Sequence, residues 1–253
     1  MLRSLKLNFE DSDRFWDARV SNAELKMLLE RIEKRAVDKI PTPYLLQEAW
    51  LIDHPFYCDE RVIIPRSYIA ELLKDELAPW VSNPENVTRV LDLCTGSGCL
   101  GIIAAEVFPN AKVDCVDISQ DALDVAKINV ERYGMQDRIE LIKSDLFNEL
   151  GDRQYDVIIS NPPYVTQEAM DNLPGEYRHE PALALGAGDD GLDIVRRLMT
   201  DSKAHLTNRG VMVVEVGDGK DACEAAYPKV PFTWLATENE DAMVYLLRKD
   251  ELP

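Results

Sequence analysis

Apolar positions in the last two thirds of the chain follow two different periods in turn. Short, largely β-branched apolar runs bounded by turn residues predict buried strands. They lie at residues 90–93, 112–116, 139–142, 156–160, 211–216, 232–236 and 243–247. Apolar residues at helical spacing predict helices at residues 100–107, 119–133, 194–206 and 220–226. Strands that alternate with helices in this way predict an α/β fold with a doubly wound, mostly parallel sheet and helices on both faces.

The first 60 residues have a different pattern. Ser21 followed by Glu24 is a capping-box signature, in which the two residues satisfy free backbone N–H groups at a helix start. The apolar stripe that follows consists of Leu25, Leu28, Leu29, Ile32 and Ala36. We expect one helix to about residue 37, ended by Pro41 and Pro43, with this stripe packed inside a small N-terminal region.

Two short β-type runs follow this helix, at residues 49–52 and 56–58. They predict a hairpin whose turn contains Asp53, His54 and Pro55. We therefore divide the chain into a small helical and hairpin region for substrate recognition, residues 1–60, and an α/β domain, residues 61–253. A further helix is expected at residues 69–77, inside the second part.

Net charge and length limit the partners of the protein. The chain has 253 residues and a net charge of −18. A surface this acidic repels a nucleic acid unless a local basic patch intervenes, and it attracts a basic protein. No apolar run reaches the length of about 20 residues that a membrane helix needs, and the start lacks the apolar stretch of a signal peptide. We expect a cytoplasmic protein with no membrane contact and no direct nucleic-acid binding.

The cysteine and histidine residues show no metal-binding spacing. The cysteines are Cys58, Cys94, Cys99, Cys115 and Cys223, and the histidines are His54, His179 and His205. The cysteine number is odd, there is no C-x-x-C pair, and no histidine is near a cysteine in sequence. Free thiols in a reducing compartment are expected, and no metal site.

A glycine-rich turn follows the first strand of the α/β part, within Asp92 to Gly101. Gly96 and Gly98 allow a tight turn and a close approach of the backbone to a ligand, because neither has a Cβ. The helix start behind them presents free N–H groups to an anionic group. Many nucleotide-binding proteins have such a turn, and it also occurs as a simple strand-to-helix connection, so it predicts a binding site only together with other residues.

Acidic residues also follow the next two strands. Asp117 ends the second strand about 20 residues after the glycines, where a carboxylate can accept from both hydroxyls of a ribose. Asp145 follows the third strand and is placed to reach an adenine amino group, with Leu146 against the ring. Any one acidic residue at a strand end is more often just a loop residue. Together with Asp92, three acidic residues at the ends of three consecutive strands favour a nucleoside site.

The tetrapeptide Asn161-Pro162-Pro163-Tyr164 follows the fourth strand directly. An amide nitrogen is a poor nucleophile, so its –NH₂ must be held with the lone pair aimed at the group to be transferred. The Asn161 side-chain oxygen and the Pro162 carbonyl could grip its two N–H bonds, and Tyr164 could stack on the planar amide. Prolines keep such a loop rigid before the substrate arrives. The alternative, a simple turn, is weaker behind a buried strand and a nucleoside site.

These motifs resemble those of the class I, Rossmann-like methyltransferases of the amino-group type, which use S-adenosyl-L-methionine. The NPPY tetrapeptide is shared by enzymes that methylate adenine in DNA and glutamine in proteins. Two further segments, Phe56 to Ser67 and Arg178 to Asp193, are similar to those of the protein glutamine methyltransferases. The resemblance extends over about residues 22–248 in order.

The resemblance implies roles for single residues. It implies that the methionine part of the cofactor contacts Cys94, Thr95, Gly96, Ser97 and Gly98. It further implies that Asp117 holds the ribose, that Leu146 lies near the adenine, and that Asn161 contacts both the cofactor region and the substrate. Pro162 and Tyr164 would contact the glutamine. Arg66 could shape the site or form a structural salt bridge, and Glu215 is interpreted as structural.

Within this family, the segment Pro65 to Leu72 is similar to that of the enzymes that act on ribosomal protein L-three, a basic protein of the large subunit. Tyr68 stands where the family pattern has proline. Three alternatives stay open: a release-factor glutamine as substrate, an adenine amino group in nucleic acid, and a non-catalytic role in ribosome assembly or cofactor sensing. An adenine methyltransferase would need a basic groove with aromatic platforms, and no basic tract of that size is present.

Overall fold

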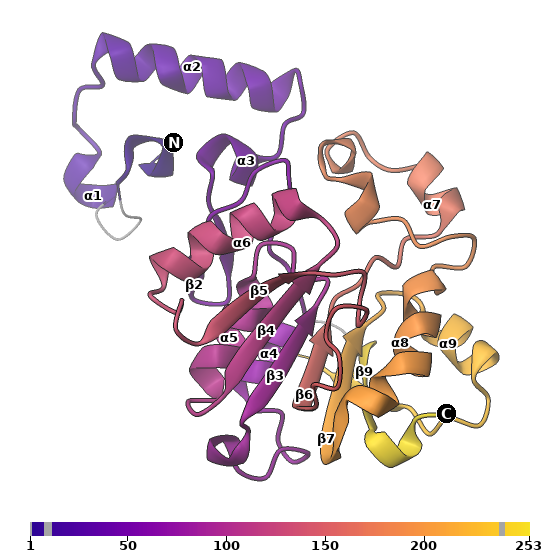
Figure 1. Ribbon diagram of the computed structural model, residues 1–253. Coiled ribbons are helices and arrows are strands. Elements are labelled where there is room, and N and C mark those ends of the chain that lie inside the picture. The colour runs from indigo at the N-terminus through magenta and orange to yellow at the C-terminus, as the bar shows by residue number, and fades with distance from the viewer. Residues whose placement is uncertain (1, 8–11, 238–240) are drawn as a thin grey trace.

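In the computed structural model, which describes residues 2–7, 12–237 and 241–253, seven strands form one sheet in the order β5-β4-β3-β6-β7-β9-β8 (Figure 1). They are β3 Arg89–Leu93, β4 Lys112–Asp117, β5 Ile139–Lys143, β6 Tyr155–Ser160, β7 Leu206–Glu215, β8 Thr233–Ala236 and β9 Asp241–Arg248. Strands β3 to β7 are parallel, and β9 runs antiparallel between β7 and β8. The predicted mostly parallel sheet is confirmed. The strand order reverses between β3 and β6, the position where such sheets bind ligands.

The central strands are apolar on both faces, because neighbouring strand residues point to opposite sides and both sides are covered. In β6, for example, Val157 and Ile159 join one core, and Ile158 joins the other. The first core includes residues of α4 Ile69–Lys74 and α5 Cys99–Val107, and the second includes residues of α8 Asp193–His205 and α9 Lys220–Ala226. The prediction of helices on both faces is therefore confirmed.

Helix α6, Gln120–Arg132, begins and ends as the sequence predicts. The Ser119 side chain accepts from the backbone N–H of Ala122, and Gly134 after the helix has a φ of +67°. Short polar side chains at the N-cap and glycine after the C-cap satisfy backbone groups that the helix leaves unpaired. The predicted helix at residues 69–77 is shorter in the structure, since α4 ends at Lys74.

The N-terminal helix is the predicted one, but its apolar stripe is not buried. The capping box at Ser21 and Glu24 is present, and α2 covers Asn22–Ala36. Leu28 is buried, whereas Leu25, Leu29 and Ile32 are 48%, 56% and 54% exposed. The expected packing of the whole stripe inside the N-terminal region is therefore wrong. The apolar side chains are exposed because α2 lies at the outside of the molecule, above α3 Thr42–Leu46 (Figure 1).

The predicted hairpin consists of β1 Ala49–Leu51 and β2 His54–Phe56, paired antiparallel. His54 and Pro55 belong to the second strand, so the turn is one of Ile52 and Asp53 and not of Asp53 to Pro55. The hairpin packs on the α/β part: Leu51 and Phe56 belong to its first core. Tyr57 exchanges two hydrogen bonds with the Asn129 side chain of α6, at 2.7 and 3.0 Å. The division of the chain at residue 60 stays a prediction.

No helix within residues 2–7, 12–237 and 241–253 is long and apolar enough to span a bilayer. The five cysteines are free thiols, and burial raises the pKa of each. Within the same ranges, no group of three or more His, Cys, Asp or Glu side chains is arranged to hold a metal ion.

Candidate active site

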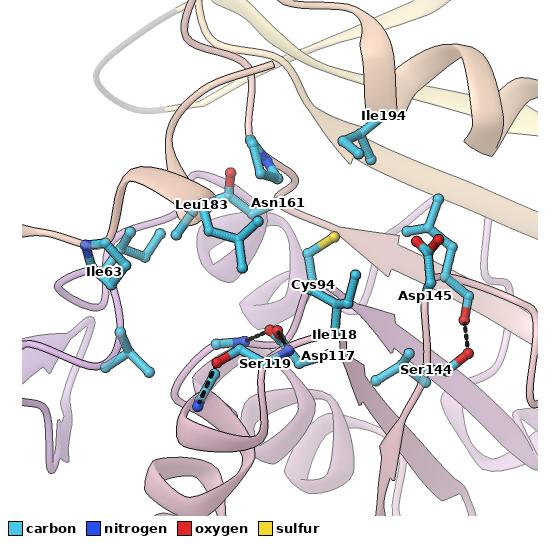
Figure 2. A pocket seen from close by; sticks show the side chains of 18 of the residues that line it. Ile63, Cys94, Asp117, Ile118, Ser119, Ser144, Asp145, Asn161, Leu183 and Ile194 are labelled. Carbon is cyan, nitrogen blue, oxygen red and sulfur yellow. Dashed lines mark hydrogen bonds between the residues drawn. The ribbon is translucent and has the colours of Figure 1, made fainter. Parts of the chain in front are cut away.

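Two adjoining cavities lie at the carboxyl ends of the central strands. The first, of about 220 Å³, is bounded by loops after β3, β4, β5 and β6 and is covered by Ile63 and Leu183 (Figure 2). The predicted residues on its wall are Cys94, Gly96, Asp117, Asp145, Leu146 and Asn161. The second is lined by Asn161, Pro162 and Tyr164 among others. Asn161 lies on both walls, so the two cavities meet at the first residue of the NPPY tetrapeptide.

The glycine-rich loop presents only part of itself to the first cavity. Cys94 and Gly96 line it, both with positive φ, and a Cβ built on Gly96 would meet no atom within 4 Å. Thr95 and Ser97 are buried below the loop. Gly98 packs against α6, where its Cβ would be 3.2 Å from the Cβ of Ala126. Thr95, Ser97 and Gly98 are therefore absent from the described cavity wall, and their contact with a cofactor stays a prediction.

Asp92 does not reach the cavity, although it belongs to the same motif. Asp92 is 1% exposed, and its Oδ2 accepts from the Thr95 hydroxyl and from the backbone N–H of Gly101. Its Oδ1 is buried without a hydrogen-bond partner. Burial raises the pKa of Asp92 to about 7. The residue thus joins the loop to the first turn of α5 from beneath.

The raised pKa of Asp92 predicts a pH-dependent contribution to stability. A carboxyl in the unfolded chain has a pKa of about 4, so the folded state binds this proton more tightly. The contribution is complete below pH 4 and is lost as the pH rises through 7. We compare the unfolding free energies of the wild type and of Asp92→Asn. The wild-type value minus the variant value should fall as the pH rises, by at most about 1.4 kcal/mol per pH unit. Urea unfolding at several pH values would measure it, and a constant or rising difference would contradict it.

Asp117 lies where the sequence predicts, at the end of β4 and on the wall of the first cavity (Figure 2). Its two oxygens accept from the backbone N–H groups of Gly96 and Ser119, both at 2.9 Å. Burial raises the pKa of Asp117, and these two bonds oppose the rise. The carboxylate is thus held in place from behind, beside the glycine-rich loop.

Asp145 and Leu146 line the first cavity on the loop after β5, next to the end of β4. Leu146 is buried with a φ of +52°, and its carbonyl accepts from the Ser144 hydroxyl at 2.8 Å. Asp145 is in an ion pair with Arg197 of α8, at 2.8 Å. Arg197 also lines the cavity, and nothing in the local sequence pattern marks it. The predicted reach of Asp145 toward an adenine amino group therefore competes with this ion pair.

Asn161 is oriented by the backbone of a distant segment. Its Nδ2 donates to the carbonyl oxygen of Arg66 at 3.2 Å. Since the amide is planar, this bond leaves Oδ1 as the acceptor on its other side. Pro162, the next residue, is buried. The structure therefore brings Asn161, Pro162 and Tyr164 together around one cavity, as predicted.

Tyr164 is fixed by close contacts with two glycines. A Cβ on Gly217 would be 2.7 Å from Cε2 of the Tyr164 ring, and one on Gly191 would be 2.4 Å from its carbonyl oxygen. Both glycines have positive φ. Burial raises the pKa of the Tyr164 phenol further above its usual range, and the nearby Glu215 adds to the rise. The ring is thus a neutral, fixed surface at the second cavity.

Two buried carboxylates hold the segment that covers the site, and the first is Glu180. It forms an ion pair with Arg66, with Nη2 2.9 Å from each carboxylate oxygen. Of the two interpretations given for Arg66, the salt bridge is confirmed.

The second of these carboxylates is Glu215, at the end of β7. It accepts from the Ser67 hydroxyl and from the backbone N–H of Tyr68. A proline at position 68 would have no N–H to donate, so this bond depends on the tyrosine that departs from the family pattern.

Curated relatives match the whole chain at high identity. A "Ribosomal protein uL3 glutamine methyltransferase" of Neisseria meningitidis serogroup A is 50% identical over 252 residues, which cover 100% of this chain and 83% of that protein. One of the same name from Burkholderia pseudomallei is 49% identical, over 100% of this chain and 85% of that protein. The chain belongs to the ribosomal protein uL3 glutamine methyltransferase family. The family resemblance inferred from the motifs is therefore confirmed.

Other comparisons agree on the fold of this family member. The family model of the methyltransferase small domain matches residues 71–175. The hMettl16 catalytic domain in complex with MAT2A 3′UTR hairpin 1 superposes with a TM-score of 0.59 at 17% identity, over 98% of this chain and 90% of that one. A methyltransferase from Pyrococcus furiosus gives a TM-score of 0.51 at 16% identity, over 91% and 99%. The predicted class I methyltransferase fold is confirmed.

The family model spans only part of the site. Cys94, Asp117 and Asn161 lie within residues 71–175, whereas Arg66, Glu180 and Glu215 lie outside. The outer residues position the segments over the cavities. Sequence reasoning left Arg66 between shaping the site and a salt bridge, interpreted Glu215 as structural, and gave Glu180 no role of its own. Their contacts join residues at least 114 positions apart, so no local pattern shows which residues they pair with.

Proposed function

We propose that this methyltransferase transfers a methyl group from S-adenosyl-L-methionine to the side-chain amide nitrogen of a glutamine in ribosomal protein uL3. The observation that carries the proposal is the meeting of two cavities at Asn161. A methyl donor and an acceptor must contact each other through one opening. The family relation names a glutamine as the acceptor and ribosomal protein uL3 as the substrate of the relatives.

The first cavity fits S-adenosyl-L-methionine. Gly96 leaves open space above its backbone, where a side chain would stand in the way of a ligand. The Asp117 carboxylate is an acceptor pair for ribose hydroxyls, and Leu146 with Ile118 offers an apolar surface for a flat base. In this assignment Cys94, Thr95, Gly96, Ser97 and Gly98 hold the methionine part. When bound, the cofactor supplies an electrophilic methyl group on a sulfonium.

The second cavity fits the glutamine side chain. Oδ1 of Asn161 and the carbonyl of Pro162 accept from the two N–H bonds of the –NH₂ group and turn its lone pair toward the first cavity. The Tyr164 ring supports the flat face of the amide. No base has to remove a proton before the transfer, because the N-methylated amide is a strong acid and loses its proton readily afterwards. Catalysis then consists of positioning and electrostatics.

The charge of the chain suits a basic substrate protein. A net charge of −18 favours encounter with a cationic partner and disfavours RNA or DNA. We assign substrate recognition to residues 1–60, where α2 exposes apolar side chains. The proposed location is the cytoplasm, where ribosomal proteins are available.

The test is methyl transfer from labelled S-adenosyl-L-methionine to an extract of cells that lack this protein. The labelled band is digested, and mass spectrometry locates the methyl group. We expect one labelled glutamine in ribosomal protein uL3, and the same label when purified uL3 replaces the extract.

Other products would overturn the proposal. Label on a release-factor glutamine would leave the reaction but change the substrate. Label on nucleic acid would replace the reaction by adenine methylation. Cofactor binding without label in any fraction would support a non-catalytic role. Nuclease and protease treatment of the labelled fraction distinguishes the first two results.

A further inference from the structure

Two segments far apart in the sequence cover the candidate active site and contact each other through Glu180. The wall of the first cavity includes Arg61, Val62 and Ile63 from one segment and Pro181, Leu183 and Ala184 from the other. Figure 2 shows Ile63 and Leu183 on the same side of the cavity as Asn161. The Glu180 side chain is 2% exposed and lines neither cavity. A buried carboxylate at this point needs partners, and its partners identify what it does.

The carboxylate of Glu180 holds the first segment at two points. Oε2 accepts from the backbone N–H of Ile64 at 3.0 Å, and both oxygens accept from Nη2 of Arg66. The guanidinium of Arg66 also lies over the Tyr177 ring, 5.2 Å from its centroid. Charge-assisted bonds to a buried anion are short and directional, so the backbone between residues 64 and 66 has one position.

That backbone position sets the orientation of the Asn161 amide. The Arg66 carbonyl oxygen lies 3.2 Å from Asn161 Nδ2. With the amide rotated by half a turn, two oxygens would face each other at that distance and repel. Nδ2 therefore stays on Arg66, and Oδ1 stays the acceptor on the other side.

We propose that Glu180 is a positioning residue for methyl transfer, which acts through Arg66 to keep Oδ1 of Asn161 facing the acceptor amide. The inference rests on the proposed function, because the orientation matters when Asn161 grips a glutamine –NH₂. Without this hold the Asn161 amide can turn its own –NH₂ toward the substrate. Two donors then face each other, and the acceptor nitrogen loses its alignment.

The test uses Glu180→Gln with purified uL3 and saturating labelled S-adenosyl-L-methionine. Glutamine has the same shape and keeps an acceptor for Ile64, but it lacks the charge that holds Arg66. We expect kcat to fall by about 10- to 100-fold, with the dissociation constant of the cofactor changed by less than about threefold. Arg66→Ala should lower kcat by a similar factor. The double variant should be no slower than the slower single variant, because both act through one contact.

A matched control separates positioning from stability. Asp114 is also a buried carboxylate in ion pairs, with Arg89 and Arg153, and it lines neither cavity. Asp114→Asn should lower the melting temperature but leave kcat of the folded enzyme within about twofold of wild type. Thermal unfolding of each variant gives the temperature range in which it is folded, and kcat is measured within that range.

Two results would overturn the inference, and they differ. If wild type labels uL3 and Glu180→Gln has the same kcat, or if kcat falls equally in Asp114→Asn, Glu180 does not position Asn161. If wild type itself does not label a glutamine, the proposed function fails, and the inference fails with it.

Discussion

Replacement of Asn161 by alanine is expected to lower kcat for glutamine methylation by about 10²- to 10³-fold. The dissociation constant of S-adenosyl-L-methionine should change by less than about threefold, because the first cavity keeps its glycine-rich loop, Asp117 and Leu146. Initial rates with purified uL3 give kcat, and calorimetric titration with the cofactor gives the dissociation constant. The separation of the two quantities is the informative part of the result.

The size of the effect follows from the nucleophile. An amide lone pair is delocalised into the carbonyl, so the reacting nitrogen depends on outside acceptors for its alignment. Asn161→Ala removes the side-chain acceptor and leaves the Pro162 carbonyl alone. A preorganised polar group at the reacting centre contributes several kcal/mol to transition-state stabilisation when it acts in a site shielded from water.

Asn110→Ala is the matched control. The Asn110 amide also donates to a backbone carbonyl, that of Glu85, at 3.0 Å, but Asn110 is exposed and lines neither cavity. It should keep the wild-type kcat. If Asn161→Ala loses cofactor binding together with activity, Asn161 serves the cofactor and the assignment to the acceptor amide is wrong. An unchanged kcat would remove it from the mechanism.

The sheet could be predicted because its central strands are buried on both faces. A short, nearly continuous apolar run such as residues 156–160 is typical of a strand that is buried on both faces. Helices between successive runs of this kind favour parallel pairing of the strands. The residues that cap α6 could also be predicted, since Ser119 and Gly134 act through bonds to their own helix. Local signals predict local structure, and the fold class follows from their order.

Site residues that follow strands were predictable for the same reason. Asp117 and Asn161 come at the ends of β4 and β6, and parallel strands bring their carboxyl ends to one edge. The ion pair of Glu180 with Arg66 spans 114 residues, and the bond of Ser67 to Glu215 spans 148. Such contacts depend on how loops pack over the sheet, which no periodicity encodes.

The exposed stripe of α2 shows a different limit. Its spacing correctly predicts a helix with one apolar face, but it does not say which element covers that face. In the structure α2 contacts α3 and Leu28 is buried, while Leu29 and Ile32 remain about half exposed. Amphipathicity is a property of one helix, whereas burial is a property of the helix and its neighbours.

Gly101→Ala is expected to destabilise the protein by about 1–3 kcal/mol, although alanine favours helix by about 1 kcal/mol over glycine. Gly101 lies in the first turn of α5, where the helix packs closely on β4. A Cβ there would be 2.2 Å from Sγ of Cys115 and 3.1 Å from Oδ2 of Asp92. Both neighbours are buried, so the helix must move, and the glycine-rich loop at its start must move with it. Urea unfolding would measure the loss.

Removal of the clashing atom should reverse much of this loss. Cys115→Ala deletes Sγ, and in that background Gly101→Ala should cost little, because the 2.2 Å contact no longer exists and the helix preference of alanine remains. The two substitutions should therefore couple by more than about 1 kcal/mol in a double-mutant cycle. Additive effects would show that the cost arises elsewhere, for example at Asp92. A strong coupling would show that α5 can pack this closely on β4 only because Gly101 has no side chain. The position of the glycine-rich loop at the start of α5 would then depend on the same glycine.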